Sequence, residues 1–413
     1  MKDLFIIAGI RTPFIRMGTD FDGLTAADLG RDACSALLAR TGIDPGRISE
    51  VIFGCVAQPY DSANVARIIA LRAGVPRHVP AATVHRNCAS GMEAITTAHQ
   101  RLAAGMGDLF LVGGAESMSQ VPLFYPHHTS RKFGALAKAK GLAAKFAAMT
   151  AFRPADFKPR IGLQLGLTDP FSGLIMGDTA EILAREHGIN REMQDEFAVG
   201  SHLKAAAARE GLEEEIVPIF VDGKPVTRDN GIRDDSSVEK LAKLKPIFDR
   251  QTGTVTAGNS SQITDGAVAL LVGDEAAVRH TGIEPLGRLV SYAYAGCDPA
   301  RMGLGPVSAI ALAKQKSGLS PADADVIEIN EAFAAQVLAV LGHLKNYGER
   351  DEIDVARINR RGGSIALGHP VGATGARLVL TALHQLKATG GRRALVSLCV
   401  GGGQGAALWL ERT

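Results

Sequence analysis

The stretch Val84-His85-Arg86-Asn87-Cys88-Ala89-Ser90-Gly91-Met92-Glu93-Ala94 marks a point where an extended segment is expected to turn into a helix. Residues 82–84 are compatible with a strand, and a helix-forming run follows over 92–102. A strand that ends at a cysteine and opens into a helix places the sulfur beside free backbone N–H groups and the positive helix end, which lowers the pKa of a thiol. Cys88 is therefore a candidate nucleophile. The alternative is a buried, inert cysteine.

The same order of elements occurs again far along the chain. The first half carries a predicted strand, a helix and a glycine-terminated strand over 48–54, 88–102 and 109–114. The second half carries this order over 324–331, 369–386 and 394–403. The match predicts an internal duplication of an α/β unit, with loops at equivalent strand ends facing one crevice. Chance similarity between two α/β units is the alternative.

Composition agrees with a layered α/β protein. The chain has 413 residues, of which 46% are hydrophobic, and its 47 glycines and few aromatic residues suit tight turns between two core-forming units. Five cysteines without a CxxC pair argue against a disulfide framework and a structural zinc site, so a reducing compartment is expected. A net charge of +2 gives no reason to expect nucleic acid as a partner.

No export or membrane signal is expected. The apolar run Leu4-Phe5-Ile6-Ile7-Ala8 is too short for a signal peptide and is followed by Arg11, so it predicts a first strand. No other stretch has the length and apolar purity of a transmembrane span. These features predict a cytoplasmic protein without a signal peptide. The segment from about 120 to 245 is more charged and is expected to be an insertion, with Asp178-Thr179-Ala180-Glu181 predicting a capping box at a helix start.

Three further motifs carry reactive side chains. The glycine-rich run 362–377 holds His369, a residue type that exchanges protons near neutral pH, although a structural hydrogen bond would also explain it. The run 399–405 holds Cys399 and glycines whose N–H groups can bind an oxygen that becomes negative; a buried bystander thiol is the alternative. Asn330 follows a strand and suits either a carbonyl or water contact or a helix N-cap. Two thiols, an imidazole and an amide are what carbon–carbon chemistry on a thioester requires.

In these motifs the chain closely resembles the thiolase family. The resemblance rests on four blocks, Asn87-Cys88-Ala89-Ser90-Gly91, Asn330-Glu331-Ala332-Phe333, Gly368-His369-Pro370 with Gly372, and Cys399-Val400-Gly401-Gly402-Gly403-Gln404-Gly405. It implies two similar βαβαβαββ halves in a five-layer α-β-α-β-α fold with an inserted loop domain, assembled as homodimers or homotetramers. The domains implied are 1–120 with 246–280, a loop domain at 121–245 that covers the site and binds coenzyme A, and 281–413.

The resemblance also implies roles for particular residues. Cys88 would be the acylated nucleophile, His369 its activating base and Cys399 the acid and base at the substrate α-carbon. Asn330 would fix a water that forms one oxyanion hole together with His369, and the N–H groups of Cys88 and Gly401 would form the second. No metal and no permanently bound cofactor are implied, because coenzyme A is a co-substrate.

Contacts with coenzyme A and acyl-CoA are implied by single matching positions. Ser261 matches a serine at the pantetheine arm, Arg233 matches a basic residue near the nucleotide, and the tunnel wall is matched by Ala257, Met176, Ala332 and Phe333. A turn serine, a solvated charge and ordinary core packing are the respective alternatives.

The middle segment is most similar to degradative members, including β subunits of the β-oxidation complex. The matching runs are 176–181, 229–233 and 254–261. This similarity implies thiolytic cleavage of 3-ketoacyl-CoA and a hydratase/dehydrogenase α subunit as a partner. One departure argues against the complex, since some long-chain subunits carry His where this chain has Asn330. The alternatives are a biosynthetic enzyme that condenses two acetyl-CoA molecules and a non-catalytic acyl-CoA-binding scaffold.

The segment Arg131–Arg160 is strongly basic. It holds eight Lys and Arg residues against Asp156 alone, which gives it a charge of +7 and leaves about −5 for the remainder. Leu142, Phe146, Met149 and Phe152 are predicted on one helical face, which Lys145 interrupts. This pattern predicts weak peripheral membrane contact through 131–160. The alternatives are an acidic partner subunit, a solvated cover, and a basic mouth that attracts the phosphates of coenzyme A.

Overall fold

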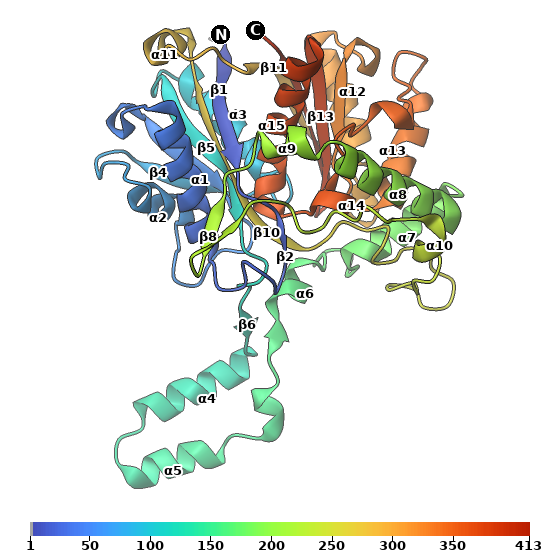
Figure 1. Cartoon of the computed structure of the whole chain (residues 1–413). Coiled ribbons are helices and arrows are strands. Elements are labelled where there is room, and N and C mark those ends of the chain that lie inside the picture. Colours follow the sequence, from blue (N-terminus) through green and yellow to red (C-terminus); the bar gives the residue numbers. More distant parts are fainter. Residues whose placement is uncertain (1–2) are drawn as a thin grey trace.

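In the computed structural model, which describes residues 3–413, strands from both halves of the chain join in a ten-stranded sheet (Figure 1). Its strands are β1 (Leu4–Arg11), β2 (Ile15–Arg16), β3 (Glu50–Gly54), β4 (Ala81–Val84), β5 (Leu109–Glu116), β10 (Thr264–Gly273), β11 (Gly287–Gly296), β12 (Val326–Ile329), β13 (Arg393–Val400) and β14 (Gln404–Glu411). The main order is β12-β13-β14-β11-β1-β10-β5-β3-β4, and β2 pairs with β10. The halves meet where β1 pairs with β11, at Leu4 opposite Leu289.

Each half of the sheet packs one face against outer helices. Its other face packs against two inner helices that lie between the halves. The outer helices are α1 (Ala26–Thr41) and α2 (Val65–Arg72) in the first half and α12 (Gly305–Ser317) and α13 (Ala334–Lys345) in the second, and the inner pair is α3 (Ser90–Ala103) and α15 (Val371–Thr389). Val51 and Phe53 pack in the outer core with α1 and α2, whereas Ile52 packs in the central core with α3 and α15. This alternation follows from the two-residue period of a strand. The predicted α-β-α-β-α order of layers is confirmed.

The two halves match in their strand pairing. In the first half β3 pairs in parallel with β4 and β5, and in the second half β12 pairs in parallel with β13. The counterpart of β4 in the second half is reduced to a single bridge between Ile327 and Ile358. The duplication is therefore present, with one strand position shortened.

Glycines bring the first turns of the two inner helices into contact. A Cβ atom on Gly91 would stand 2.6 Å from the backbone nitrogen of Ala376, and one on Gly375 would stand 2.7 Å from that of Met92. Neither position has room for a larger residue, because real Cβ atoms do not approach other atoms this closely. The N-terminal ends of α3 and α15 therefore lie side by side. The candidate residues directly before each helix are brought to the same place.

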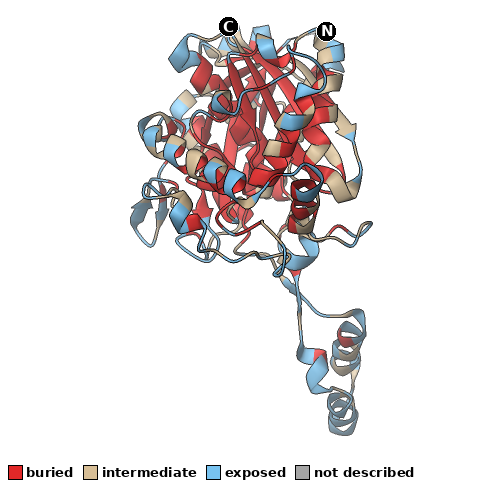
Figure 2. Cartoon of the chain, turned by 90° about the vertical axis from the view of Figure 1, so that its right-hand side faces the viewer, coloured by how far each residue is buried: buried red, intermediate tan, exposed pale blue. Residues whose placement is uncertain are grey.

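The middle of the chain lies over the body and then leaves it. Over the body it forms α6 (Gly162–Gly166), α7 (Met176–Glu186), α8 (Arg191–Ala207), α9 (Arg209–Glu213), β8 (Ile219–Val221), β9 (Lys224–Val226) and α10 (Val238–Leu241). Outside the body are β6 (Leu123–Phe124), α4 (His127–Lys138), α5 (Leu142–Thr150) and β7 (Arg160–Ile161), which project as a hairpin from the side opposite both termini (Figure 1). Figure 2 shows that buried residues fill the body while the hairpin is largely exposed. No helix within residues 3–413 is long and apolar enough to span a membrane.

The remaining elements are short. They are α11 (Glu275–Thr281), α14 (Ser364–Leu367) and 3₁₀ turns at Pro45–Arg47, Pro154–Phe157, Pro299–Leu304, Pro321–Asp323 and Val355–Arg357.

The predicted capping box at Asp178 is wrong in its position. Asp178 lies at the third residue of α7, where its carboxylate accepts a hydrogen bond from the backbone N–H of Ile175 at 3.2 Å. Glu181, expected to close the box, instead accepts from the backbone N–H groups of Thr254 and Val255, each at 2.9 Å. The helix therefore begins three residues earlier than the pattern indicates, and Glu181 joins it to the chain that follows the insertion.

Candidate active site

Cys88 lies in the turn between β4 and α3, two residues before the helix begins. Asn87 adopts a left-handed backbone conformation, with φ of 41°, that redirects the chain from strand to helix. The Ser90 hydroxyl accepts from the N–H of Arg86 at 2.9 Å and donates to the carbonyl of Asn87 at 2.7 Å. These bonds fix the turn, so the sulfur of Cys88 lies at the start of α3 as the sequence predicts.

The expected lowering of the Cys88 pKa is wrong for this structure. Burial raises the pKa of the Cys88 thiol to about 11, although hydrogen bonds from the backbone N–H groups of Gly401 and Cys88 act to lower it. The desolvation of a thiolate therefore outweighs the helix end and the N–H groups. Since a thiol with this pKa is protonated near neutral pH, its activation requires a base.

The glycine run after β13 supplies the N–H of Gly401 that faces Cys88. The side-chain amide of Asn87 donates to the Gly401 carbonyl at 2.7 Å, so the residue beside the thiol also holds the glycine loop. Gly402 and Gly403 have φ of 85° and 79°, in the left-handed region where glycine is favoured. The loop from the second half is thus turned back toward Cys88.

His369 is a buried, neutral imidazole with a defined tautomer. Its Nδ1 lies 2.7 Å from the hydroxyl of Thr374, which itself donates to the carbonyl of Pro370 at 3.0 Å. A hydroxyl has one proton, so Thr374 must accept from Nδ1–H, which assigns the proton to Nδ1 and leaves Nε2 as a lone-pair acceptor. Burial and the nearby Arg377 lower the pKa of His369 to about 4. His369 can therefore act as a base at neutral pH.

Asn330 follows β12 and is not the helix N-cap that the sequence left open, because α13 begins at Ala334 after Phe333. Its Oδ1 accepts from the Ser364 hydroxyl at 2.6 Å, and this bond orients the amide. The Asn330 Nδ2 and the His369 Nε2 are both buried without a hydrogen-bond partner among residues 3–413. Buried polar atoms are normally paired, so both are available to a bound oxygen atom.

Cys399 lies near the end of β13 and is buried. Burial raises the pKa of its thiol well above the ordinary value, and the adjacent Cys88 raises it further. This effect of Cys88 on the thiol of Cys399 indicates that the two side chains belong to the same site. Cys399 also packs against an apolar cluster that includes Met176, Ala332 and Phe333, three of the residues predicted to line a tunnel.

Of the remaining residues predicted to contact coenzyme A, Ser261 borders the apolar cluster, whereas Ala257 and Arg233 are exposed. The N–H of Ser261 donates to the carbonyl of Ala332 at 2.9 Å, and the neighbouring Ser260 forms a β-bridge with Phe333. Ser261 therefore borders the same apolar cluster. Ala257 is exposed on the preceding loop. Arg233 is also exposed, and its backbone N–H donates to the Nδ1 of His202 at 3.3 Å, outside that cluster.

Glu116 is a buried residue of the site region that the sequence interpretation missed. Its carboxylate accepts from the N–H groups of Gly372 at 2.8 Å and of Val56 and Ala57 at 3.1 and 2.9 Å. Burial raises the pKa of Glu116 to about 7. Glu116 thereby ties the loop that carries His369 to the first half. An acidic residue at the end of the apolar strand 109–116 was the available signal.

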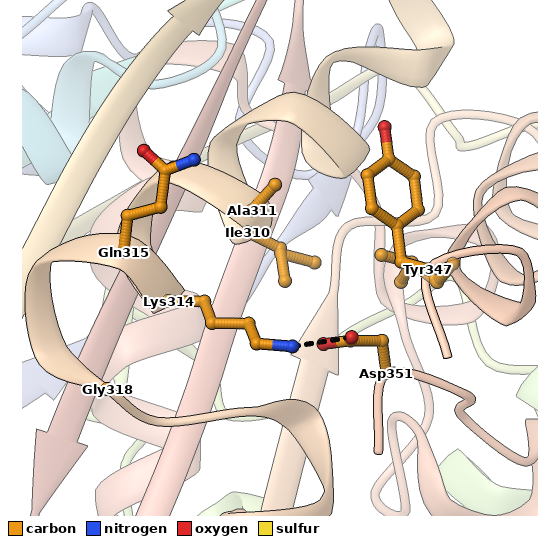
Figure 3. A pocket seen from close by; sticks show the side chains of 8 residues that line it. Ile310, Ala311, Lys314, Gln315, Gly318, Tyr347 and Asp351 are labelled. Carbon is orange, nitrogen blue, oxygen red and sulfur yellow. Dashed lines mark hydrogen bonds and ion pairs between the residues drawn. The ribbon is translucent and has the colours of Figure 1, made fainter. Parts of the chain in front are cut away.

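A surface hollow of about 400 Å³ lies elsewhere, between α12 and α13. Its lining residues are Ile310, Ala311, Lys314, Gln315, Gly318, Leu344, Tyr347 and Asp351. The Lys314 ammonium and the Asp351 carboxylate in it form an ion pair at 2.6 Å (Figure 3). Because its charges neutralise each other and it holds none of the reactive side chains, it is separate from the candidate active site.

The chain belongs to the thiolase family. Residues 4–276 match the family model described as "Thiolase, N-terminal domain", and residues 283–412 match "Thiolase, C-terminal domain". The chain is therefore an enzyme of the acyltransferase class, as predicted.

Individual relatives align over nearly the whole chain. A 3-ketoacyl-CoA thiolase of Pectobacterium atrosepticum is 40% identical, with 98% of this chain and 96% of the relative covered. Beta-ketothiolase BktB of Cupriavidus necator is 39% identical, with 100% and 99% covered. A crystal structure of human mitochondrial 3-ketoacyl-CoA thiolase in complex with CoA superimposes with a TM-score of 0.89 at 38% identity. The match covers 100% of this chain and 98% of that one. The predicted fold class is thus confirmed.

Proposed function

We propose that this enzyme is an acetyl-CoA C-acyltransferase that cleaves 3-ketoacyl-CoA with coenzyme A during fatty-acid β-oxidation. In the first step the Nε2 of His369 takes the proton of Cys88, and the sulfur attacks the 3-keto carbon. The bond between C2 and C3 then breaks, and Cys399 protonates the released acetyl-CoA enolate at carbon. The proton on His369 then passes to the Cys399 thiolate, and the shortened acyl group remains on Cys88.

In the second step coenzyme A resolves the acyl-enzyme. His369 takes the proton of the incoming thiol, whose sulfur attacks the Cys88 thioester and displaces the Cys88 thiolate. The same proton then passes to Cys88, and the shortened acyl-CoA leaves. The N–H groups of Cys88 and Gly401 are suited to stabilise the oxyanion of one step, and a water on the Asn330 amide together with His369 that of the other.

One observation carries this proposal. The Nε2 of the buried, neutral His369 has no hydrogen-bond partner among residues 3–413, in a site where the protonated Cys88 thiol accepts a hydrogen bond from the N–H of Gly401. The test compares two variants against 3-ketoacyl-CoA substrates of four to sixteen carbons. Cys88→Ser should lose thiolysis on the order of 10³-fold or more and form no acyl-enzyme by mass spectrometry. Cys399→Ser should lose cleavage but still exchange acyl groups between acyl-CoA and coenzyme A, because exchange needs no proton at carbon.

Near-normal thiolysis by Cys88→Ser would refute the assignment of the nucleophile. Inactivity of the unmodified enzyme at every chain length, with no acyl-enzyme, would favour the scaffold alternative.

The second candidate is the biosynthetic condensation of two acetyl-CoA molecules. It uses the same residues in reverse order, and the 39% identity to Beta-ketothiolase BktB supports it. Activity restricted to the four-carbon substrate would favour condensation. Activity on longer chains would favour degradation.

We also propose the domain division predicted from the sequence, with the loop domain at 121–245 covering the site and contributing contacts to coenzyme A. A homodimer or homotetramer in the cytoplasm is proposed as well, supported for the compartment by five cysteines that are all free. The hydratase/dehydrogenase α subunit remains a proposed partner. Light scattering of the pure protein, and co-purification with that subunit, test these points.

A further inference from the structure

The projecting hairpin, residues 123–161, is held together by a partly exposed cluster of aromatic side chains. A two-stranded stem pairs Leu123 with Ile161, and beyond it α4 packs along α5. Phe133 contacts Phe152, Phe157 and Tyr125, with ring centroids 4.9, 6.4 and 5.6 Å away. The hairpin therefore has a defined inner side. Phe152, predicted to lie on an outward helical face, belongs to this inner cluster.

The single acidic residue of the basic segment is paired with basic side chains inside the hairpin. Asp156 is buried, and its carboxylate contacts the Lys132 ammonium at 2.6 Å and the His128 imidazole at 3.3 Å. It also accepts from the N–H of Arg153 at 2.7 Å. Asp156 consequently does not offset the outward charges.

Seven basic side chains remain exposed on the hairpin, without an ion pair to any carboxylate of residues 3–413: Arg131, Lys138, Lys140, Lys145, Arg153, Lys158 and Arg160. The rest of the chain is net acidic. The hairpin is thus a positively charged arm on a negatively charged body.

An apolar face lies among these charges. Leu142, Phe146 and Met149 occupy α5 at a spacing of four and three residues, which places them on one side of the helix. Their exposed fractions are 89%, 70% and 59%. Exposed apolar residues are common singly, but three in a row on the outer helix of a protruding arm form a contact surface.

We propose that the hairpin docks the enzyme on an anionic lipid surface. Leu142, Phe146 and Met149 enter the boundary between headgroups and acyl chains, and the surrounding lysines and arginines bind the lipid phosphates. Helices that bind membrane surfaces combine an apolar face with Lys and Arg, and each basic residue near an anionic leaflet strengthens binding. The projection keeps the acidic body away from the lipid charge.

A second copy of the chain fits this face less well. A symmetric contact would bring the same surface of two copies together, so seven positive charges would face seven more. Three side chains on one short helix also offer far less than the roughly 800 Å² per partner of a stable interface. An anionic membrane supplies both the opposite charge and the apolar phase.

The test is co-sedimentation of the full chain, without substrate, with vesicles of phosphatidylcholine alone or with added phosphatidylglycerol. Binding should require phosphatidylglycerol and weaken with salt. The triple variant Leu142→Ser, Phe146→Ser, Met149→Ser should bind more weakly by roughly tenfold or more. The double variant Lys138→Glu, Lys145→Glu should lose roughly fivefold or more for each changed charge.

Two matched control variants make the same types of substitution on the body of the protein instead of the hairpin. Tyr60→Ser with Phe220→Ser alters two residues that are 84% and 69% exposed, and Lys224→Glu with Lys387→Glu alters two exposed lysines. Both controls should bind vesicles like the unmodified enzyme.

Three outcomes would overturn the proposal. The first is binding that ignores phosphatidylglycerol or falls equally in the controls. The second is an oligomer that dissociates in the triple variant while vesicle binding is unchanged, which would assign the face to a second copy. The third is a raised KM for coenzyme A in the lysine variant with unchanged vesicle binding, which would assign the charges to substrate phosphates.

Discussion

Replacing Thr374 with valine tests whether the tautomer of His369 matters, because the change removes one hydroxyl and nearly preserves the shape of the side chain. In the structure this hydroxyl accepts the Nδ1 proton of His369 and donates to the carbonyl of Pro370. Valine can do neither. The imidazole then gains by moving its proton to Nε2, where a bound oxygen atom can accept it, or by rotating, and either change removes the lone pair that activates Cys88.

The size of the effect follows from the burial of the site. Thr374 is fully buried and His369 is 8% exposed, so water cannot easily replace the lost acceptor. Leaving a buried donor unpaired costs about 1–3 kcal/mol. At 1.4 kcal/mol per factor of ten, the ratio of the active to the inactive tautomer falls by about 5- to 150-fold. We expect kcat/KM for thiolysis to fall by up to this factor.

The assay is the rate of 3-ketoacyl-CoA loss for Thr374→Val beside Thr374→Ser, which keeps the hydroxyl and should stay within about threefold of the unmodified enzyme. Urea unfolding of both variants checks that the fold is intact. The ¹⁵N shifts of labelled His369 report directly which ring nitrogen is protonated. A valine variant with an unchanged rate, or a serine variant as impaired as the valine one, would refute the role assigned to the hydroxyl.

Ser364→Ala should lower kcat about tenfold, because the amide that this hydroxyl orients can then rotate; an unchanged kcat would count against that orientation. Gly401→Ala should retain most activity, since its Cβ would meet the Met176 sulfur at an ordinary 3.4 Å. Gly403→Ala should unfold at clearly lower urea, because its backbone is left-handed and its Cβ would lie 2.4 Å from the Cys297 carbonyl. Equal stability of these two variants would contradict the geometry. The pH profile of kcat/KM for the free enzyme should show no limb caused by Cys88 or His369 between about pH 5 and 10. The thiol of Cys88 stays protonated below about 11, and His369 stays neutral above about 4. An acid limb near 6.5 that disappears on replacing His369 would show that its pKa is not lowered.

Local pattern was sufficient for several features of the fold. The strand-to-helix junction at Cys88, the repeated order of elements in the two halves and the glycines around His369 could all be recognised from neighbouring residues. Boundaries were predicted less well, as α7 shows. The pattern around Asp178 is a genuine cap signal, but tertiary contacts of Glu181 with the chain after the insertion decide where that helix begins.

The chemistry of individual groups depended on contacts that sequence spacing does not encode. The helix end at Cys88 predicts a lowered thiol pKa, whereas burial raises it to about 11. Thr374 is five residues from His369 and lies in the first turn of α15, yet only its hydrogen bonds identify it as the group that sets the tautomer. Glu116 is 256 residues from Gly372, to which it is bonded.

The sequence by itself determined which reactive groups the protein has and the order of strands and helices that carries them, because both depend on residue type and short-range periodicity. Tertiary structure alone decided how those groups behave. Contact between Gly91 and Ala376 brings two helix starts together, and the exclusion of water there sets the protonation states of Cys88 and His369. Desolvation and long-range hydrogen bonds arise only once distant segments are packed against one another.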